Sequence, residues 1–281
     1  MLGKLFVHEW KDSWKLMAIL NGAVLVLSLA GIVLNIFTGA MDKSTMFKSG
    51  GTMSFMIYGS YLLLYVLSIF ALTVGSALYF YVRFYRNLYT DQGYLMHTLP
   101  VSEHSLIWSK ALIAIIWRLV GMVIMAVGIG SLMVSFLGPA LHADLPSLKH
   151  AYRELGIADI NPLYQIMYAL LAITFAIGSV IFSVFQGYAA ISIGQLASKN
   201  KVLASVGAYF GIQIALSIIS NILTQSLMFM AFRIDFRWDL LNNNNPMFLL
   251  YLAGANVGIY GVSVGFYFIT QQIMKKRLNL E

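Results

Sequence analysis

The side chains best suited to chemistry in this chain are histidine, arginine and the amides, and few have the spacing of a reaction centre. His97 and His104 lie seven positions apart, but Pro100 stands between them and interrupts any helix that would align them. We interpret both as solvated loop histidines, not metal ligands. No HExxH pair and no GxxxxGK[ST] phosphate-binding loop occurs in the sequence. These patterns predict a chain that is not an enzyme and holds no cofactor of its own.

A second group of polar residues falls within long apolar segments. Arg118, beside Trp117, is the one charged residue deep within a segment, since Lys110 lies near the start of its segment, and no Asp or Glu lies inside these segments. Ion-coupled carriers usually keep intramembrane carboxylates that bind the driving ion, so their absence argues against such a carrier. We interpret Arg118 as either a snorkelling side chain or a substrate contact. Three amides within the segments either hydrogen-bond between helices or line a substrate pathway: Gln213, Asn221 and Asn256.

The composition is that of a membrane protein. The chain has 281 residues, of which 59% are hydrophobic and 10% are charged, whereas an ordinary soluble domain has about 25% charged residues. The net charge of +7 is scattered over segment ends, which is typical of membrane-protein loops and not of a nucleic-acid surface. The absence of cysteine excludes disulfides and thiolate metal sites.

Six apolar segments predict an all-α polytopic membrane protein with six transmembrane helices. Each segment reaches the roughly 20 residues that cross a bilayer core, and all five prolines fall between segments. Small residues at helical spacing, such as Gly187 and Gly194 or Gly254 and Gly258, predict seams of close helix approach, within the bundle or against a second subunit. The segments are residues 16–37, 55–82, 106–137, 163–195, 203–232 and 247–272.

The chain divides into an N-terminal helix, residues 1–15, and a transmembrane domain, residues 16–281. Within the first stretch, Trp10 and Trp14 share an apolar face while Lys4, Lys11 and Lys15 share the opposite one. This pattern predicts an amphipathic helix in the headgroup layer, with a plain extension of the first span as the alternative. The distribution of Lys and Arg places both termini in the cytoplasm.

The loop between the second and third spans, residues 83–110, is the longest cytoplasmic connection: "RFYRNLYTDQGYLMHTLPVSEHSLIWSK". Gly93 permits a turn, and Leu99 is extended because it precedes Pro100. Ser102 stands where the next helix needs an N-cap. The segment is apolar at its centre, which predicts either a cytoplasmic partner or packing on its own bundle or lipid. These apolar residues are Tyr94, Leu95, Met96 and Leu99.

This stretch resembles the six-span permease subunits of bacterial type-2 ATP-binding-cassette (ABC) transporters. The resemblance extends over the chain in span count and loop placement, and it is specific in detail from Arg83 to Lys110. In that family this loop includes a coupling helix, which docks into a cleft of the cytoplasmic ATPase subunit. The resemblance implies that the docking residues here are Gly93, Tyr94, Leu95, His97, Thr98, Leu99 and Pro100.

The resemblance also implies a function. The chain would form the substrate pathway of an exporter in the bacterial plasma (inner) membrane, driven by a separate nucleotide-binding subunit that holds ATP and Mg. A second permease subunit, identical or related, would complete the pathway. The alternatives are an ion-coupled secondary transporter and a non-transporting membrane scaffold or immunity protein.

Overall fold

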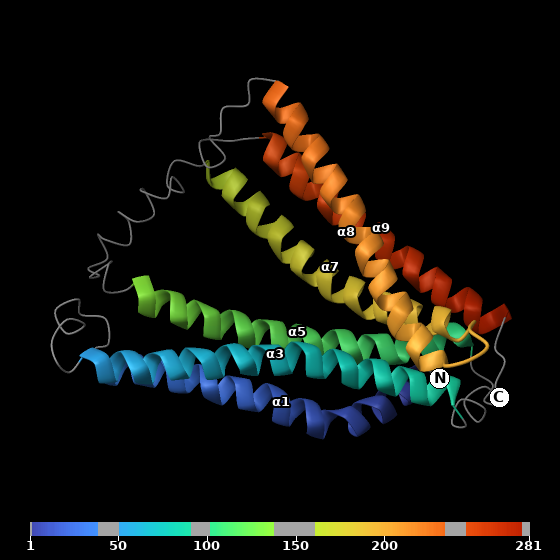
Figure 1. Cartoon of the computed structure of the whole chain (residues 1–281), viewed down its shortest axis with the longest axis horizontal. Helices are drawn as coiled ribbons and strands as arrows, with labels where there is room; N and C mark the ends of the chain where they lie inside the picture. The colour runs from blue at the N-terminus through green and yellow to red at the C-terminus, as the bar shows by residue number, and fades with distance from the viewer. Residues whose placement is uncertain (1, 39–50, 91–101, 138–160, 234–245, 277–281) are drawn as a thin grey trace. The chain divides into compact units, whose positions relative to one another are not determined.

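The computed structural model describes residues 2–38, 51–90, 102–137, 161–233 and 246–276. Nearly all of them belong to six α-helices (Figure 1). The helices are α1 (Leu2–Thr38), α3 (Gly51–Tyr89), α5 (Glu103–Leu137), α7 (Pro162–Gly194), α8 (Lys201–Arg233) and α9 (Pro246–Lys276).

All six helices are long and apolar enough to cross a membrane, and the described residues contain no strand. The predicted all-α fold with six transmembrane helices is therefore confirmed. Several helices extend past the predicted segments. The 39 residues of α3 correspond to about 58 Å, against a bilayer core of about 30 Å. A helix of this length must tilt or project beyond the bilayer.

The N-terminal residues continue directly into the first span. From Leu2 onward they form the first turns of α1, with no break before the apolar segment. Lys4, Lys11 and Lys15 are exposed, whereas Ser13 and Met17 are fully buried. The placement of this stretch in the headgroup layer stays a prediction.

The described helices group into two compact units, and the boundary falls inside α3 and α5. One unit contains Gly3–Tyr79 and Leu112–Ala158; the other contains Phe80–Ala111 and Asp159–Glu281, with Met1–Leu2. We call them the α1 unit and the α7 unit.

The core of the α1 unit forms around two tyrosines of α3. Tyr61 and Tyr65 stack with ring centroids 6.0 Å apart, and Val24 and Leu72 pack with them. The Tyr61 hydroxyl donates to the Leu27 carbonyl at 3.0 Å, which ties α3 to α1. Glycine is needed opposite both rings, because a Cβ on either facing glycine, Gly31 or Gly128, would overlap a tyrosine hydroxyl.

In the α7 unit, α7 packs against both α8 and α9 (Figure 1). Helices α7 and α9 run parallel, since Asn256 donates to the Leu171 carbonyl at 3.2 Å and Phe266 contacts Phe182 farther along both helices. The start of α7 is capped by Asn161, whose side chain accepts from the Leu163 amide at 3.0 Å.

A six-residue turn, residues 195–200, reverses the chain between α7 and α8. Asn200 adopts a positive φ of 52°, a conformation that Asn tolerates better than most residues. The Ser205 hydroxyl reaches back to the Ile191 carbonyl at 3.3 Å. A Cβ at Gly194 would overlap the Ser205 backbone, so glycine permits this close approach.

Candidate functional site

The seven predicted docking residues, from Gly93 to Pro100, lie outside the described residues. The structure does describe the helix ends on both sides of them, Tyr89 at the end of α3 and Glu103 at the start of α5. These two ends belong to the α7 unit. The structure therefore describes the candidate site through the two helix ends that border it.

The end of α3 is held on α7 by aromatic packing. Phe84 and Tyr188 stack with centroids 3.8 Å apart and planes 7° from parallel, and both side chains are buried. One turn earlier, the Tyr81 hydroxyl donates to the Ser183 carbonyl at 2.6 Å. Its ring occupies the space that a side chain at Gly187 would fill. These contacts fix the last turns of α3 before the loop.

The last residue of α3 adds a polar tie. The hydroxyls of Tyr89 and Ser192 lie 2.7 Å apart and share a hydrogen bond. Ser192 is fully buried and its hydroxyl also donates to the Tyr188 carbonyl at 2.9 Å. The chain thus leaves α3 from a position bonded to the last turn of α7.

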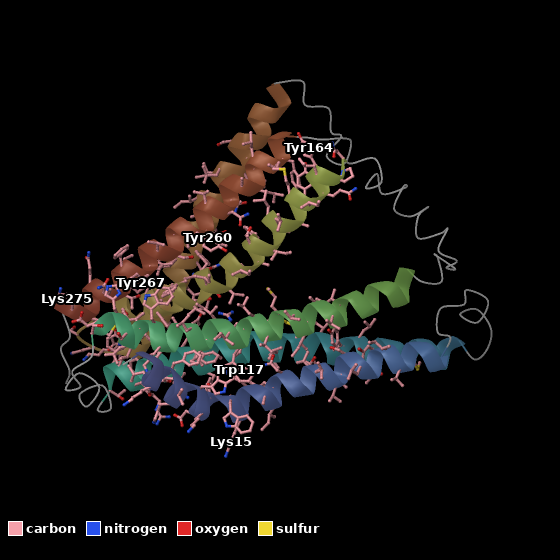
Figure 2. The ribbon with its side chains drawn as sticks, turned by 180° about the vertical axis from the view of Figure 1, so that it is seen from behind. Lys15, Trp117, Tyr164, Tyr260, Tyr267 and Lys275 are labelled. Carbon is pink, nitrogen blue, oxygen red and sulfur yellow. The ribbon has the colours of Figure 1, made fainter. Side chains whose placement is uncertain are left out.

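The start of α5 is held on α9 and α7. His104 hydrogen-bonds to the hydroxyl of Tyr267, which projects from α9 towards the first turns of α5 (Figure 2). Trp108 contacts both Tyr267 and Phe185, each at a centroid distance of 5.7 Å. We call the rings that hold the two helix ends the aromatic anchor: Tyr81, Phe84, Trp108, Phe185, Tyr188 and Tyr267.

Helix α5 begins at the predicted place. The carbonyl of Ser102 accepts from the amides of Ser105 and Leu106 at 2.9 and 3.2 Å, so Ser102 occupies the N-cap position. Its hydroxyl lies 3.0 Å from the hydroxyl of Ser105. Of the two histidines that were predicted to lie in a solvated loop, only His104 is described. That prediction is wrong for His104, which lies in the first turn of α5 and hydrogen-bonds to Tyr267. No group of three or more His, Asp or Glu side chains within the described ranges is placed to hold a metal ion.

The four predicted pathway or interface residues do not form one cluster. Gln213 lies on α8 and accepts a hydrogen bond at 2.7 Å from the buried amide of Gln186. Asn256 lies on α9, and its contact on α7 is Leu171. Leu171 and Gln186 are 15 positions apart on α7, which is about 22 Å along the helix axis. Arg118 is half-buried on α5 and belongs to the α1 unit.

Three side-chain polar atoms are buried without a hydrogen-bond partner in the part of the chain that the structure describes. They are the Oδ1 atoms of Asn21 and Asn256 and the Nε1 atom of Trp117. Trp117, labelled in Figure 2, instead stacks on Trp10 at 5.1 Å. Trp10 was predicted to lie on the apolar face of the N-terminal helix, and the structure places its ring against Trp117 of α5.

Helix α8 carries a stripe of mostly exposed polar side chains. The sequence prediction named only its two amides, Gln213 and Asn221. Only 6% of the most apolar stretch of α8 is buried, which is a smaller share than in any of the other five described spans. At 100° per residue, five polar side chains fall within about 100° of one face. All are exposed except the half-exposed Thr224: Gln213, Ser217, Ser220, Asn221 and Thr224. Their spacing of three and four positions is the signal that could have revealed the stripe.

The stripe includes groups that bond only within their own helix. The Asn221 amide donates to the Ser217 carbonyl at 2.8 Å, and the Ser220 hydroxyl donates to the same carbonyl at 3.0 Å. Such back-bonding satisfies donors without a neighbouring helix. Gln213 is the member that reaches α7.

The fold and these sites define the class of protein, an integral membrane protein with six transmembrane helices. Comparison with protein-family models, with curated protein sequences and with solved structures gives no match for this chain.

Proposed function

We propose that this chain is the membrane-spanning permease subunit of an ABC transporter. It forms part of the substrate pathway, and ATP hydrolysis in a separate cytoplasmic subunit drives export. The proposal places the chain in the bacterial plasma membrane with both termini in the cytoplasm, as the distribution of Lys and Arg predicts.

The aromatic anchor is the observation that carries this proposal. Both helix ends that border residues 91–101 are fixed to α7 and α9, through Phe84 on Tyr188 and through Trp108 on Phe185 and Tyr267. Close-packed interiors pass on a displacement nearly as a rigid body. A push on this loop would therefore move α7 and α9 together.

The polar stripe of α8 supports a transport role. Polar groups at bilayer depth are costly unless water or protein covers them. Ser217, Ser220 and Asn221 are exposed on a helix that is largely apolar. A hydrated pathway between this chain and a second permease subunit would cover them. That second subunit is an identical copy or a related chain.

The driving step belongs to the partner. Two ATP-binding subunits that close together on ATP would displace the loops docked in their clefts. The differential affinity of ATP for the closed and open states supplies the free energy. Helices α7 and α9 would receive the displacement through the aromatic anchor and open the pathway outward.

The test uses single charges in the predicted docking segment. In Tyr94→Asp and Leu99→Asp, a carboxylate must be desolvated to enter an apolar cleft. We expect these variants to lose the co-purifying ATP-binding subunit and ATP-driven transport in proteoliposomes. The matched controls Tyr94→Phe and Leu99→Ile keep the apolar surface, and both activities should persist.

Assembly and ATP-driven transport that survive both Asp substitutions would refute the docking proposal. Transport driven by a proton or sodium gradient without ATP would instead identify a secondary carrier. A chain that co-purifies with no ATP-binding subunit and moves nothing in either assay would be a scaffold.

A further inference from the structure

Five helix termini gather at one end of the α7 unit. The Tyr89–Ser192 hydrogen bond places the end of α3 beside the end of α7, and α8 begins after the six-residue turn that follows α7. The His104–Tyr267 bond places the start of α5 beside α9, which ends nine residues after Tyr267. We call this region the basic end, for the charges described next.

The basic end carries exposed cations on three separate elements. Arg86 lies on α3, Lys199 in the turn between α7 and α8, and Lys275 at the end of α9, where Figure 2 labels it. Arg83 and Lys201 are half-exposed in the same region. Among the described residues of the α7 unit, Glu103 is the only acid. The region therefore has a clear excess of positive charge.

The position of these cations relative to the bilayer follows from the exposed apolar residues next to them. Val82 precedes Arg83 and Arg86 and is 52% exposed, while Val202 follows Lys199 and is 58% exposed. On α9, Phe268 is 51% exposed about two turns before Lys275. Apolar side chains exposed on membrane-spanning helices face acyl chains. Cations one or two turns beyond them lie at the level of the headgroups, and the short α7–α8 turn keeps Lys199 there.

We propose that the basic end is a binding surface for the headgroups of anionic phospholipids. The phosphate of such a lipid accepts hydrogen bonds from Arg and Lys while its acyl chains cover Val82, Val202 and Phe268. A protein partner would meet the same charges, but it would not account for the apolar surface that begins beside each of them. This surface is independent of the docking segment and of the proposed function.

The test compares lipids on the purified chain alone in detergent. Short-chain phosphatidylglycerol should raise its thermal unfolding temperature, and short-chain phosphatidylcholine should not. In the triple variant Arg86→Gln, Lys199→Gln, Lys275→Gln, the apparent affinity for phosphatidylglycerol should fall by about 10-fold or more. Salt at about 1 M should weaken the effect on the unmodified chain, because it screens charges beyond about 3 Å.

Two controls separate this surface from general attraction. The charge-preserving variant Arg86→Lys, Lys199→Arg, Lys275→Arg should keep the effect. So should Lys43→Gln, Lys48→Gln, Lys149→Gln, which removes equal charge from the α1 unit. The proposal is overturned if the Gln variant at the basic end responds normally or if the variant in the α1 unit loses the effect equally. It also fails if inorganic phosphate stabilises as well as phosphatidylglycerol, or if the substitutions act only when an ATP-binding subunit is present.

Discussion

At the scale of single residues, glycines on α7 mark where another segment comes into contact. Tyr81 fills the space beside Gly187, and the Ser205 backbone fills the space beside Gly194. By contrast, nothing in the described chain lies within 4 Å of a Cβ built on Gly207 or Gly211 of α8. The same residue type therefore has opposite roles on two adjacent helices.

This contrast gives a matched pair of substitutions. Gly194→Ala forces the new methyl into the Ser205 backbone, so we expect a loss of about 1–3 kcal/mol in the free energy of unfolding. Gly211→Ala meets no neighbour and should be neutral or slightly stabilising, because alanine favours helix over glycine. Unfolding in mixed micelles measures both. Equal losses at the two positions would contradict this packing.

A second residue-scale prediction concerns the Gln186–Gln213 bond. Gln186 is 2% exposed, so Gln213→Leu leaves a buried amide without its acceptor and should cost about 1–2 kcal/mol. The double variant Gln186→Leu, Gln213→Leu removes both partners and should cost less than the sum of the single changes. A double-mutant cycle measures this coupling, and strict additivity would show that the bond contributes nothing.

At the scale of elements, α8 differs from the other spans because its polar stripe is uncovered. The chain has no cysteine, so single cysteines report on each face without background labelling. In proteoliposomes, Ser217→Cys and Ser220→Cys should react with a membrane-impermeant thiol reagent. Ile222→Cys, on the opposite face and 60% exposed, should be protected by lipid. Comparable rates at Ser220 and Ile222 would mean that water does not reach the stripe.

The helices themselves were predictable because bilayer thickness sets their length. Apolar runs and proline positions placed all six spans, and Ser102 correctly marked the start of α5. Their ends were less predictable, because α1 continues without a break through residues that read as a separate amphipathic helix. Helical hydrogen bonding does not stop where hydropathy falls.

At the scale of the whole molecule, helix pairing could not be predicted from the sequence. A helix in lipid is apolar on nearly every side, so its pattern does not distinguish a protein-facing side from a lipid-facing one. The Tyr81–Ser183 bond joins residues 102 positions apart, and no local pattern indicates it. The predicted glycine seams illustrate this limit, since Gly187 and Gly194 are in close contacts while Gly254 and Gly258 meet no atom of the described chain.

The division of α3 and α5 between the two units has a mechanical consequence. Helices α3 and α5 each continue without a break across the boundary between the two units, α3 at Tyr79–Phe80 and α5 at Ala111–Leu112. Under the proposed function, a displacement of the loop between Tyr89 and Glu103 would enter the α7 unit first, because both bordering helix ends belong to it. It would pass to the α1 unit along the continuous helices α3 and α5, so a proline substituted near position 79 or 112 should weaken this transmission.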